Sequence, residues 1–217
     1  MRATDFITEA PLPDDWDQTV YKKETPFSVR VQYAKERAQR LGSGSSRVAF
    51  VIDYKGRQTV LKIAKNKKGI AQNEAESLIL SDGYLHGQGK MVPIIDYDTQ
   101  GHTWIHCELA QKATVVAMRN YFQLNNWNDL IRLEDKYAER ANIRHRAEAQ
   151  WDLCTQNATE DHKEMLEGWV SFLHVLRVDF GVHLGDFDRI QNWGFYQGHP
   201  VILDVGFTEH VHDTHYR

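Results

Sequence analysis

The feature that most constrains the fold is a pair of strand-forming stretches on either side of the turn signal Lys55-Gly56. Residues 48–54 and 58–64 are rich in β-branched and aromatic side chains, so the sequence predicts a β-hairpin. A second hairpin is predicted from residues 92–97 and 103–109, which flank a Thr-Gln-Gly turn. Both hairpins fall in the first half of the chain.

The remaining segments are mostly helical in pattern. Residues 28–40 and 69–81 are expected to form helices, and a third is expected to begin near Asn126 or Asn128. Residues 159–178 form a fourth, with a hydrophobic stripe for a core. That stripe consists of Leu166, Trp169, Val170, Leu173 and Leu176. Short strands at 192–196 and 201–204 complete the order, and early strands followed by late helices are typical of an α+β chain with two lobes.

Length and composition exclude several classes of protein. A chain of 217 residues suits one domain or two small lobes, and its net charge of −4 argues against a general nucleic-acid binder. No apolar run approaches the ~18 residues of a membrane span. Cys107 and Cys154 provide no disulfide framework, so a cytoplasmic location is the simplest expectation.

A glycine- and serine-rich segment at 42–46 precedes the first predicted hairpin. Glycines at 42 and 44 allow a tight turn whose N–H groups can approach phosphate oxygens. The segment lacks the Gly-Lys-Ser/Thr ending of a Walker loop and precedes a strand, which argues against a dinucleotide fold. The alternative interpretation is a flexible Gly/Ser loop.

Lys62 lies inside a predicted strand that is apolar on both faces. A lysine in such a place needs an anionic partner or ligand, unless it sits near the strand end and reaches water. The helix expected at 69–81 carries Glu74 and Glu76, which point about 200° apart around its axis. Glu74 is favoured as the partner because Leu78 follows one turn later on the same face. Both glutamates could instead be solvated.

Asp204 comes at the end of a predicted strand and is followed by Val205 and Gly206. A carboxylate there, with the amide oxygen of Asn192 twelve residues earlier, suits Mg²⁺, which binds few protein ligands besides phosphate oxygens. A strand that simply ends in an Asp/Gly turn would give the same pattern. In the tail, His210, His212 and His215 include a His-x-His pair that could bind zinc, but no further ligand nearby completes the set, so a polar tail is the favoured interpretation.

Together these residues resemble the protein-kinase family. The parts follow the family's order: a Gly-rich loop at 42–46, the strand Lys62, the helix Glu74, a catalytic aspartate at Asp186, the downstream Asn192 and an Asp-x-Gly motif at 204–206. The resemblance spans residues 41–207 and is closest to atypical small kinases and kinase-like proteins of bacterial viruses. It implies a two-lobed fold with segments 1–40 (arm and helix), 41–110 (nucleotide-binding lobe) and 111–217 (truncated, mainly helical lobe). In a viral protein the location would be the host cytoplasm.

The resemblance implies that ATP and Mg²⁺ bind and that phosphate passes to a protein or small hydroxyl acceptor. By the same resemblance, Lys62 would hold the α- and β-phosphates and pair with Glu74. Asp186, the expected catalytic aspartate, would orient the acceptor or accept its proton. The expected nucleotide-binding residues are Gly42, Ser43, Gly44, Ser45, Ser46, Lys62, Glu74 and Glu108, the last at the hinge to the adenine. The expected magnesium ligands are Asn192 and Asp204.

The sequence also departs from the family pattern. Arg47 replaces the third glycine of the loop, and Asp186 lies six residues before Asn192 where five are usual, which makes Asp188 a rival base. The chain ends eleven residues after Gly206, so the late peptide-binding helices have no counterpart in it. A degenerate kinase fold that acts as a protein-interaction module is therefore an alternative, and so is transfer of AMP.

Overall fold

A computed structural model describes residues 12–139, 151–156 and 158–216. The chain forms two compact units. The first contains the chain up to Ser77 together with Pro93–Leu109, and the second contains Leu78–Val92 and the chain from Ala110 onward. The expected α+β class is confirmed. The first eleven residues of the expected 1–40 arm lie outside the described residues, and the described remainder belongs to the first unit.

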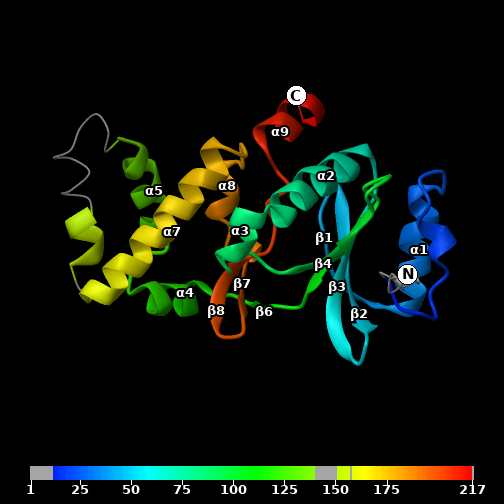
Figure 1. Cartoon of the computed structure of the whole chain (residues 1–217), viewed down its shortest axis with the longest axis horizontal. Coiled ribbons are helices and arrows are strands. Elements are labelled where there is room, and N and C mark those ends of the chain that lie inside the picture. The colour runs from blue at the N-terminus through cyan, green and yellow to red at the C-terminus, as the bar shows by residue number, and fades with distance from the viewer. Residues whose placement is uncertain (1–11, 140–150, 157, 217) are drawn as a thin grey trace, which may run out of the picture. The chain divides into compact units, whose positions relative to one another are not determined.

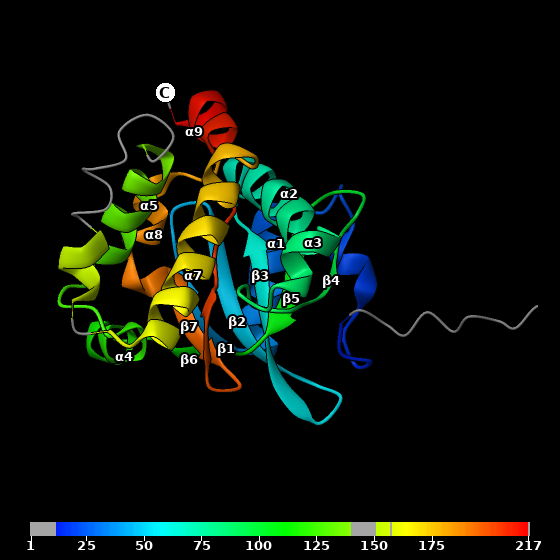
Figure 2. The same ribbon diagram turned by 60° about the vertical axis from the view of Figure 1, so that its left-hand side comes forward.

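The first unit is built on a five-stranded antiparallel sheet with the order β1-β2-β3-β5-β4 (Figures 1 and 2). Its strands are β1 (Gln39–Ser43), β2 (Arg47–Tyr54), β3 (Arg57–Ala64), β4 (Ile94–Tyr97) and β5 (Trp104–Glu108). Both predicted hairpins are confirmed, and they share this one sheet. The turn at Lys55 and Gly56 has positive φ at both residues, 50° and 77°, which is the geometry that a two-residue hairpin requires.

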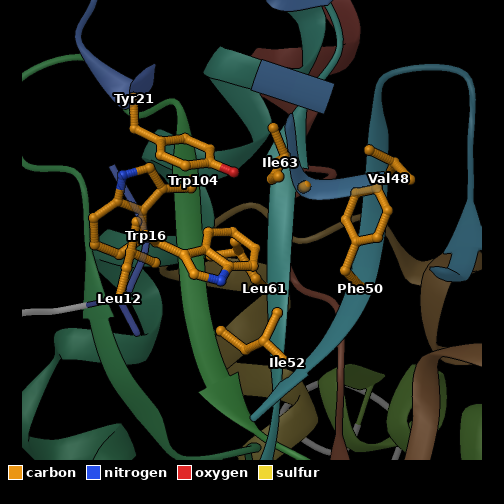
Figure 3. Close-up of a cluster of buried hydrophobic side chains, with 10 residues drawn as sticks. Leu12, Trp16, Tyr21, Val48, Phe50, Ile52, Leu61, Ile63 and Trp104 are labelled. Carbon is orange, nitrogen blue, oxygen red and sulfur yellow. The ribbon is translucent and has the colours of Figure 1, made fainter. Parts of the chain in front are cut away.

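The N-terminal arm covers one face of this sheet. It includes the 3-10 helix η1 (Gln18–Tyr21) and leads into α1 (Phe27–Arg37). Leu12, Trp16 and Tyr21 are buried against side chains of the sheet, as Figure 3 shows. The sheet side chains in this cluster are Val48, Phe50, Ile52, Leu61, Ile63 and Trp104. Trp16 and Tyr21 therefore fasten the arm to the sheet.

Helix α1 is shorter than expected, and β1 was not expected at all. The helix ends at Arg37, and Ala38 already has extended backbone geometry. The next residues pair with β2, from Gln39 opposite Val51 onward. Every residue of β1 is exposed, so no hydrophobic alternation marks this edge strand in the sequence.

The other face of the sheet carries Lys62. Leu61 and Ile63 point into the cluster under the arm, and Lys62 alternates to the opposite side. Ala49 on β2 lies directly across from Lys62, and Arg47 is two residues earlier on the same strand, so both share this face. Helix α2 (Lys67–Ser81) begins three residues after β3 and supplies the partners of these two cations.

The second unit is mainly helical, with a small antiparallel sheet of order β6-β7-β8. Its elements are α3 (Gly83–Gly87), β6 (Gln111–Lys112), α4 (Val115–Phe122), α5 (Asp129–Glu139), α7 (Glu160–Val178), α8 (Leu184–Phe187), the 3-10 helix η2 (Ile190–Asn192), β7 (Trp193–Tyr196), β8 (His199–Ile202) and α9 (Glu209–His215). Helices α5 and α7 pack side by side (Figures 1 and 2). None of the described helices combines the length and the apolar character needed to cross a membrane.

Helix α7 supplies the core of this unit. The hydroxyl of Thr159 accepts a hydrogen bond from the N–H of His162 and caps the start of the helix. The predicted core stripe is confirmed, because Leu166, Trp169, Val170, Leu173 and Leu176 are all buried. Trp169 packs against Phe122 and Trp193, with ring centroids 5.6 and 5.4 Å apart. Trp169 and Trp193 are thus core residues of this unit.

Candidate functional site

The glycine-rich segment joins two strands of the sheet. Gly42 and Ser43 end β1, and the following residues turn into β2. The N–H of Gly44 donates to the carbonyl of Arg47 at 2.9 Å, which closes the turn. The structure describes no partner for the N–H groups of Ser45 and Ser46. These two donors suit a phosphate group, which is the ligand that the sequence predicts here.

Residues just after β3 hold the turn in place. The ammonium group of Lys65 donates to the carbonyl of Gly44 and, at 3.2 Å, to the hydroxyl of Ser43. The amide of Asn66 donates to the carbonyl of Ser45 at 3.1 Å. These three hydrogen bonds connect the turn to the residues that follow β3.

A third set of contacts joins the turn to helix α2. The backbone N–H of Lys65 donates to the carbonyl of Ser46 at 2.8 Å, and the Ser46 hydroxyl donates to the side chain of Gln72. Gly69 lies so close to the Ser46 carbonyl that a Cβ atom at this position would overlap it. Strand, turn and helix thus form one hydrogen-bonded structure.

Lys62 and Glu76 form a buried ion pair on this face of the sheet. Nζ of Lys62 donates to Oε1 of Glu76, and the two side chains are 13% and 0% exposed. Nη1 of Arg47 donates to the other carboxylate oxygen, Oε2. The buried strand lysine thus has an anionic partner, as predicted, but it shares that partner with a second cation.

The expectation that Glu74 would pair with Lys62 is wrong. Its side chain is 55% exposed, and its Oε1 lies 3.9 Å from Nε2 of His102. Leu78 does not mark the buried face of the helix, because its side chain is exposed. The buried face instead passes through Asn73, Glu76 and Leu80.

Arg47 and Asn73 complete this cluster. Their contacts with it were not predicted from the sequence. Nη1 of Arg47 also donates to Oδ1 of Asn73 at 3.2 Å, and the Asn73 amide donates to the carbonyl of His102 at 2.9 Å. One signal could have revealed Arg47. In an antiparallel hairpin with its turn at 55–56, it lies on the same face as Lys62.

Glu108 lies at the end of β5, directly before the chain passes from the first unit to the second. Its carboxylate forms an ion pair with Arg57 at 2.6 Å, and its N–H donates to the carbonyl of Pro93 at 2.9 Å. Both groups are therefore engaged within the first unit.

In the second unit, Asp186 lies in the short helix α8 and is buried. Its N–H donates to the carbonyl of His183 at 2.9 Å, and its carboxylate lies 3.5 Å from Nη1 of Arg189. The rival, Asp188, is exposed. A carboxylate held in a buried, defined position is the better candidate for directed proton transfer, which favours Asp186 as the base.

Two hydrogen bonds link Asp186, Asn192 and the segment that carries Asp204. The side-chain amide of Asn192 donates to the carbonyl of Asp186 at 3.1 Å. The N–H of Leu203 donates to the carbonyl of Asn192 at 2.7 Å, which places the residue before Asp204 beside Asn192. Oδ1 of Asp204 accepts a hydrogen bond from the N–H of Gly206 at 3.2 Å. Asp186, Asn192 and Leu203 are thus linked by hydrogen bonds, and Asp204 follows directly.

Two tryptophans support this loop from the core. The indole N–H of Trp193 donates to the carbonyl of Phe187 at 2.9 Å, and that of Trp127 donates to the carbonyl of Asp188 at 3.2 Å. The two indoles pack edge to face, 5.2 Å apart. The two tryptophans thus hold the backbone beside Asp186 through hydrogen bonds that the sequence did not predict.

The described residues contain no group of three or more His, Cys, Asp or Glu side chains that could hold a metal ion. The histidines of the tail lie in α9, and Nδ1 of His212 is 3.1 Å from its neighbour Asp213. Asn192 and Asp204 offer an amide and a carboxylate oxygen. Mg²⁺ uses such oxygens in small number and completes its shell with phosphate and water oxygens, so this donor set fits that ion.

The candidate residues thus form two sets. The Gly-rich turn, Lys62 and Glu76 belong to the first unit, and Asp186, Asn192 and Asp204 belong to the second. Comparisons of the chain with protein-family models, with curated proteins and with solved structures found no match.

Proposed function

We propose that this chain is a kinase-like phosphotransferase that binds ATP with Mg²⁺ and transfers the terminal phosphoryl group to a hydroxyl of a protein or a small molecule. One observation carries the proposal. Lys62, on the third strand of an antiparallel sheet, forms a buried ion pair with Glu76 on the helix that follows. A strand-to-helix Lys–Glu pair beside a glycine-rich turn is the nucleotide-positioning arrangement of protein kinases.

In this proposal, the residues of the first unit hold the triphosphate. Lys62 donates to the phosphate oxygens while Glu76 orients its ammonium group. The N–H groups of Ser45 and Ser46 add neutral donors in the turn. Phosphoryl transfer depends mostly on positioning and electrostatics, and fixed donors of this kind provide both.

The residues of the second unit act on the acceptor and the metal. Asn192 and Asp204 would hold Mg²⁺, which neutralises charge on the phosphate oxygens when bound. Asp186 orients the acceptor hydroxyl and takes its proton. As the hydroxyl oxygen bonds to the γ-phosphorus, the bond from that phosphorus to the bridging oxygen breaks, and its electron pair leaves with ADP.

A binding module is the second candidate. The six-residue spacing from Asp186 to Asn192 and the arginine at the third glycine position both depart from the active-kinase pattern. A degenerate kinase fold of this kind would act through contact with another protein, with or without nucleotide. Transfer of AMP, with the nucleotide bound in the reverse direction, uses the same residues and is a further alternative.

Labelled ATP separates these possibilities. The protein is incubated with γ-labelled and, separately, α-labelled ATP, with and without Mg²⁺, alongside the variants Lys62→Met and Lys35→Met. We expect Mg²⁺-dependent loss of the γ-label from ATP to an acceptor or to water, abolished by Lys62→Met. Lys35 is an exposed residue of α1, so its variant should behave as wild type.

Other outcomes of this assay have definite meanings. Transfer of the α-label alone would indicate AMP transfer. Retention of both labels, together with nucleotide binding that raises the melting temperature, would favour the binding module. A protein with neither transfer nor binding would overturn the proposal.

A further inference from the structure

The buried carboxylate of Glu76 is shared by two cations from neighbouring strands. Lys62 on β3 donates to Oε1, and Arg47 on β2 donates to Oε2. All three side chains are largely withdrawn from water, with exposed fractions of 13%, 8% and 0% for Lys62, Arg47 and Glu76. The Lys–Glu pair of the proposed function requires only one of these cations, so the second needs an explanation.

Ligand binding gives a physical reason for a second cation. When Lys62 turns toward phosphate oxygens, its hold on Glu76 weakens, and a buried carboxylate without a partner is strongly unfavourable. Arg47 remains on the opposite oxygen and continues to compensate the charge. The planar guanidinium group suits this permanent role, whereas the lysine ammonium on its flexible stem is suited to reorientation.

Arg47 is itself fixed at both its backbone and its side chain. Its carbonyl accepts the hydrogen bond from Gly44 that closes the glycine-rich turn. Its guanidinium group donates to Asn73 as well as to Glu76, and Asn73 is held by the carbonyl of His102. One residue therefore connects the turn to the carboxylate that orients Lys62.

We infer that Arg47 is a positioning residue for phosphate binding: it retains Glu76 and the glycine-rich turn in place while Lys62 engages the phosphate groups of the nucleotide. The inference rests on the proposed function. It applies to ligands with phosphate groups, such as ADP and ATP with Mg²⁺. Adenosine has no phosphate group, so its binding does not require Lys62. The affinity for adenosine should therefore not depend on Arg47.

A double-mutant cycle on ligand affinity tests this. Dissociation constants for MgADP and for adenosine are measured by calorimetry for wild type, Arg47→Gln, Lys62→Met and the double variant. We expect Arg47→Gln to weaken MgADP binding roughly tenfold, the loss typical of one charge-assisted hydrogen bond, and to leave adenosine binding unchanged. In the background of Lys62→Met, Arg47→Gln should have no further effect, because Arg47 acts through Lys62.

Two further variants exclude a purely structural role. Arg47→Lys retains the charge and should restore most of the MgADP affinity lost in Arg47→Gln. Arg40→Met removes an exposed arginine of β1, near the same turn, and should bind both ligands as wild type does. Equal losses of MgADP and adenosine affinity in Arg47→Gln, or additive losses in the double variant, would overturn the inference.

The outcomes distinguish this inference from the proposed function. If Lys62→Met loses MgADP but Arg47→Gln does not, the inference fails and the proposed function stands. If the wild-type protein binds no nucleotide, both fail. If Arg47→Gln does not fold, the cycle is run with Arg47→Lys. We expect this variant to lose about threefold in MgADP affinity, and we expect no such loss when Lys62→Met is also present. If Arg47→Lys binds MgADP as tightly as wild type, or loses as much affinity in the Lys62→Met background as alone, the inference is overturned.

Discussion

Lys62 and Glu76 are 14 positions apart in the sequence and form a buried ion pair between β3 and α2. The pair fixes helix α2 against the strand that carries the lysine. A buried ion pair adds little stability over well-packed apolar residues, but the loss of one member leaves a buried charge without a partner. This asymmetry makes the pair a sensitive point for mutation.

Replacement of Glu76 should destabilise the protein strongly. Glu76→Gln leaves two cations, Lys62 and Arg47, without their shared carboxylate, and the expected loss in the free energy of unfolding is about 3–5 kcal/mol. Urea unfolding followed by circular dichroism measures it. Glu74→Gln on the same helix is the matched control, and its effect should stay within about 0.5 kcal/mol because Glu74 is exposed. Equal effects in the two variants would contradict the assignment of Glu76.

Gly69 should not tolerate a side chain. A Cβ atom there would overlap the carbonyl oxygen of Ser46, which is backbone and cannot move without disturbing the glycine-rich turn. Alanine favours a helix over glycine by up to about 1 kcal/mol, but overlap in a packed site costs about 1–3 kcal/mol, so Gly69→Ala should be net destabilising. Thermal unfolding provides the measurement. Gly83→Ala in α3, with open space around the added methyl group, should be neutral or stabilising.

Asp98 should make the stability of the first unit sensitive to acid. Burial raises the pKa of Asp98, but hydrogen bonds from the Thr103 hydroxyl and from the N–H groups of Gly101, Thr103 and Gln100 outweigh it and hold the pKa below its ordinary value of 3.8. The ionised group therefore adds stability that is fully present above pH 3.8 and is lost as the pH falls through the lowered pKa. Asp98→Asn should lower stability at neutral pH and by less in acid.

The measurement for Asp98 is urea unfolding of wild type and Asp98→Asn at pH 7 and near pH 3. The difference in unfolding free energy between the two proteins should shrink at the lower pH. Asp53→Asn, at an exposed position of β2, is the control for loss of one negative charge. A difference that stays constant with pH would exclude a role for Asp98 ionisation.

The acidic residues of the second unit should have separate roles. Asp204→Asn is expected to weaken Mg²⁺-dependent nucleotide binding, because a neutral amide is a poorer ligand for a hard cation than a carboxylate. Asp186→Asn should spare binding and reduce turnover at least 100-fold, the usual scale for loss of a catalytic base. Equilibrium binding and single-turnover kinetics measure the two effects separately.

Asp188→Asn serves as the control for Asp186, since it removes the rival carboxylate two residues away. It should leave both binding and turnover near wild type. If Asp188→Asn removes turnover and Asp186→Asn does not, the base has been assigned to the wrong aspartate. If neither variant matters, the binding-module alternative is supported.

The sequence by itself predicted the elements whose signals are local. The hairpin of β2 and β3 follows from two stretches rich in β-branched and aromatic side chains around the turn signal Lys55-Gly56, and the buried face of α7 follows from its period of three to four residues. It also placed Lys62 on a buried strand in need of an anionic partner. The hairpin, the buried helix face and the strand around Lys62 all depend on residues that are close together along the chain. Their sequence patterns can therefore be recognised without knowledge of the tertiary structure.

Tertiary structure decided what depends on contacts between distant segments. Strand β1 has no buried residue to mark it and exists through its hydrogen bonds to β2. The choice of Glu76 over Glu74 was set by which side of α2 packs on the sheet, because two residues 200° apart on a helix cannot both face inward. Only the packed sheet and helix bring Arg47 onto the same carboxylate as Lys62, since that contact joins residues 29 positions apart.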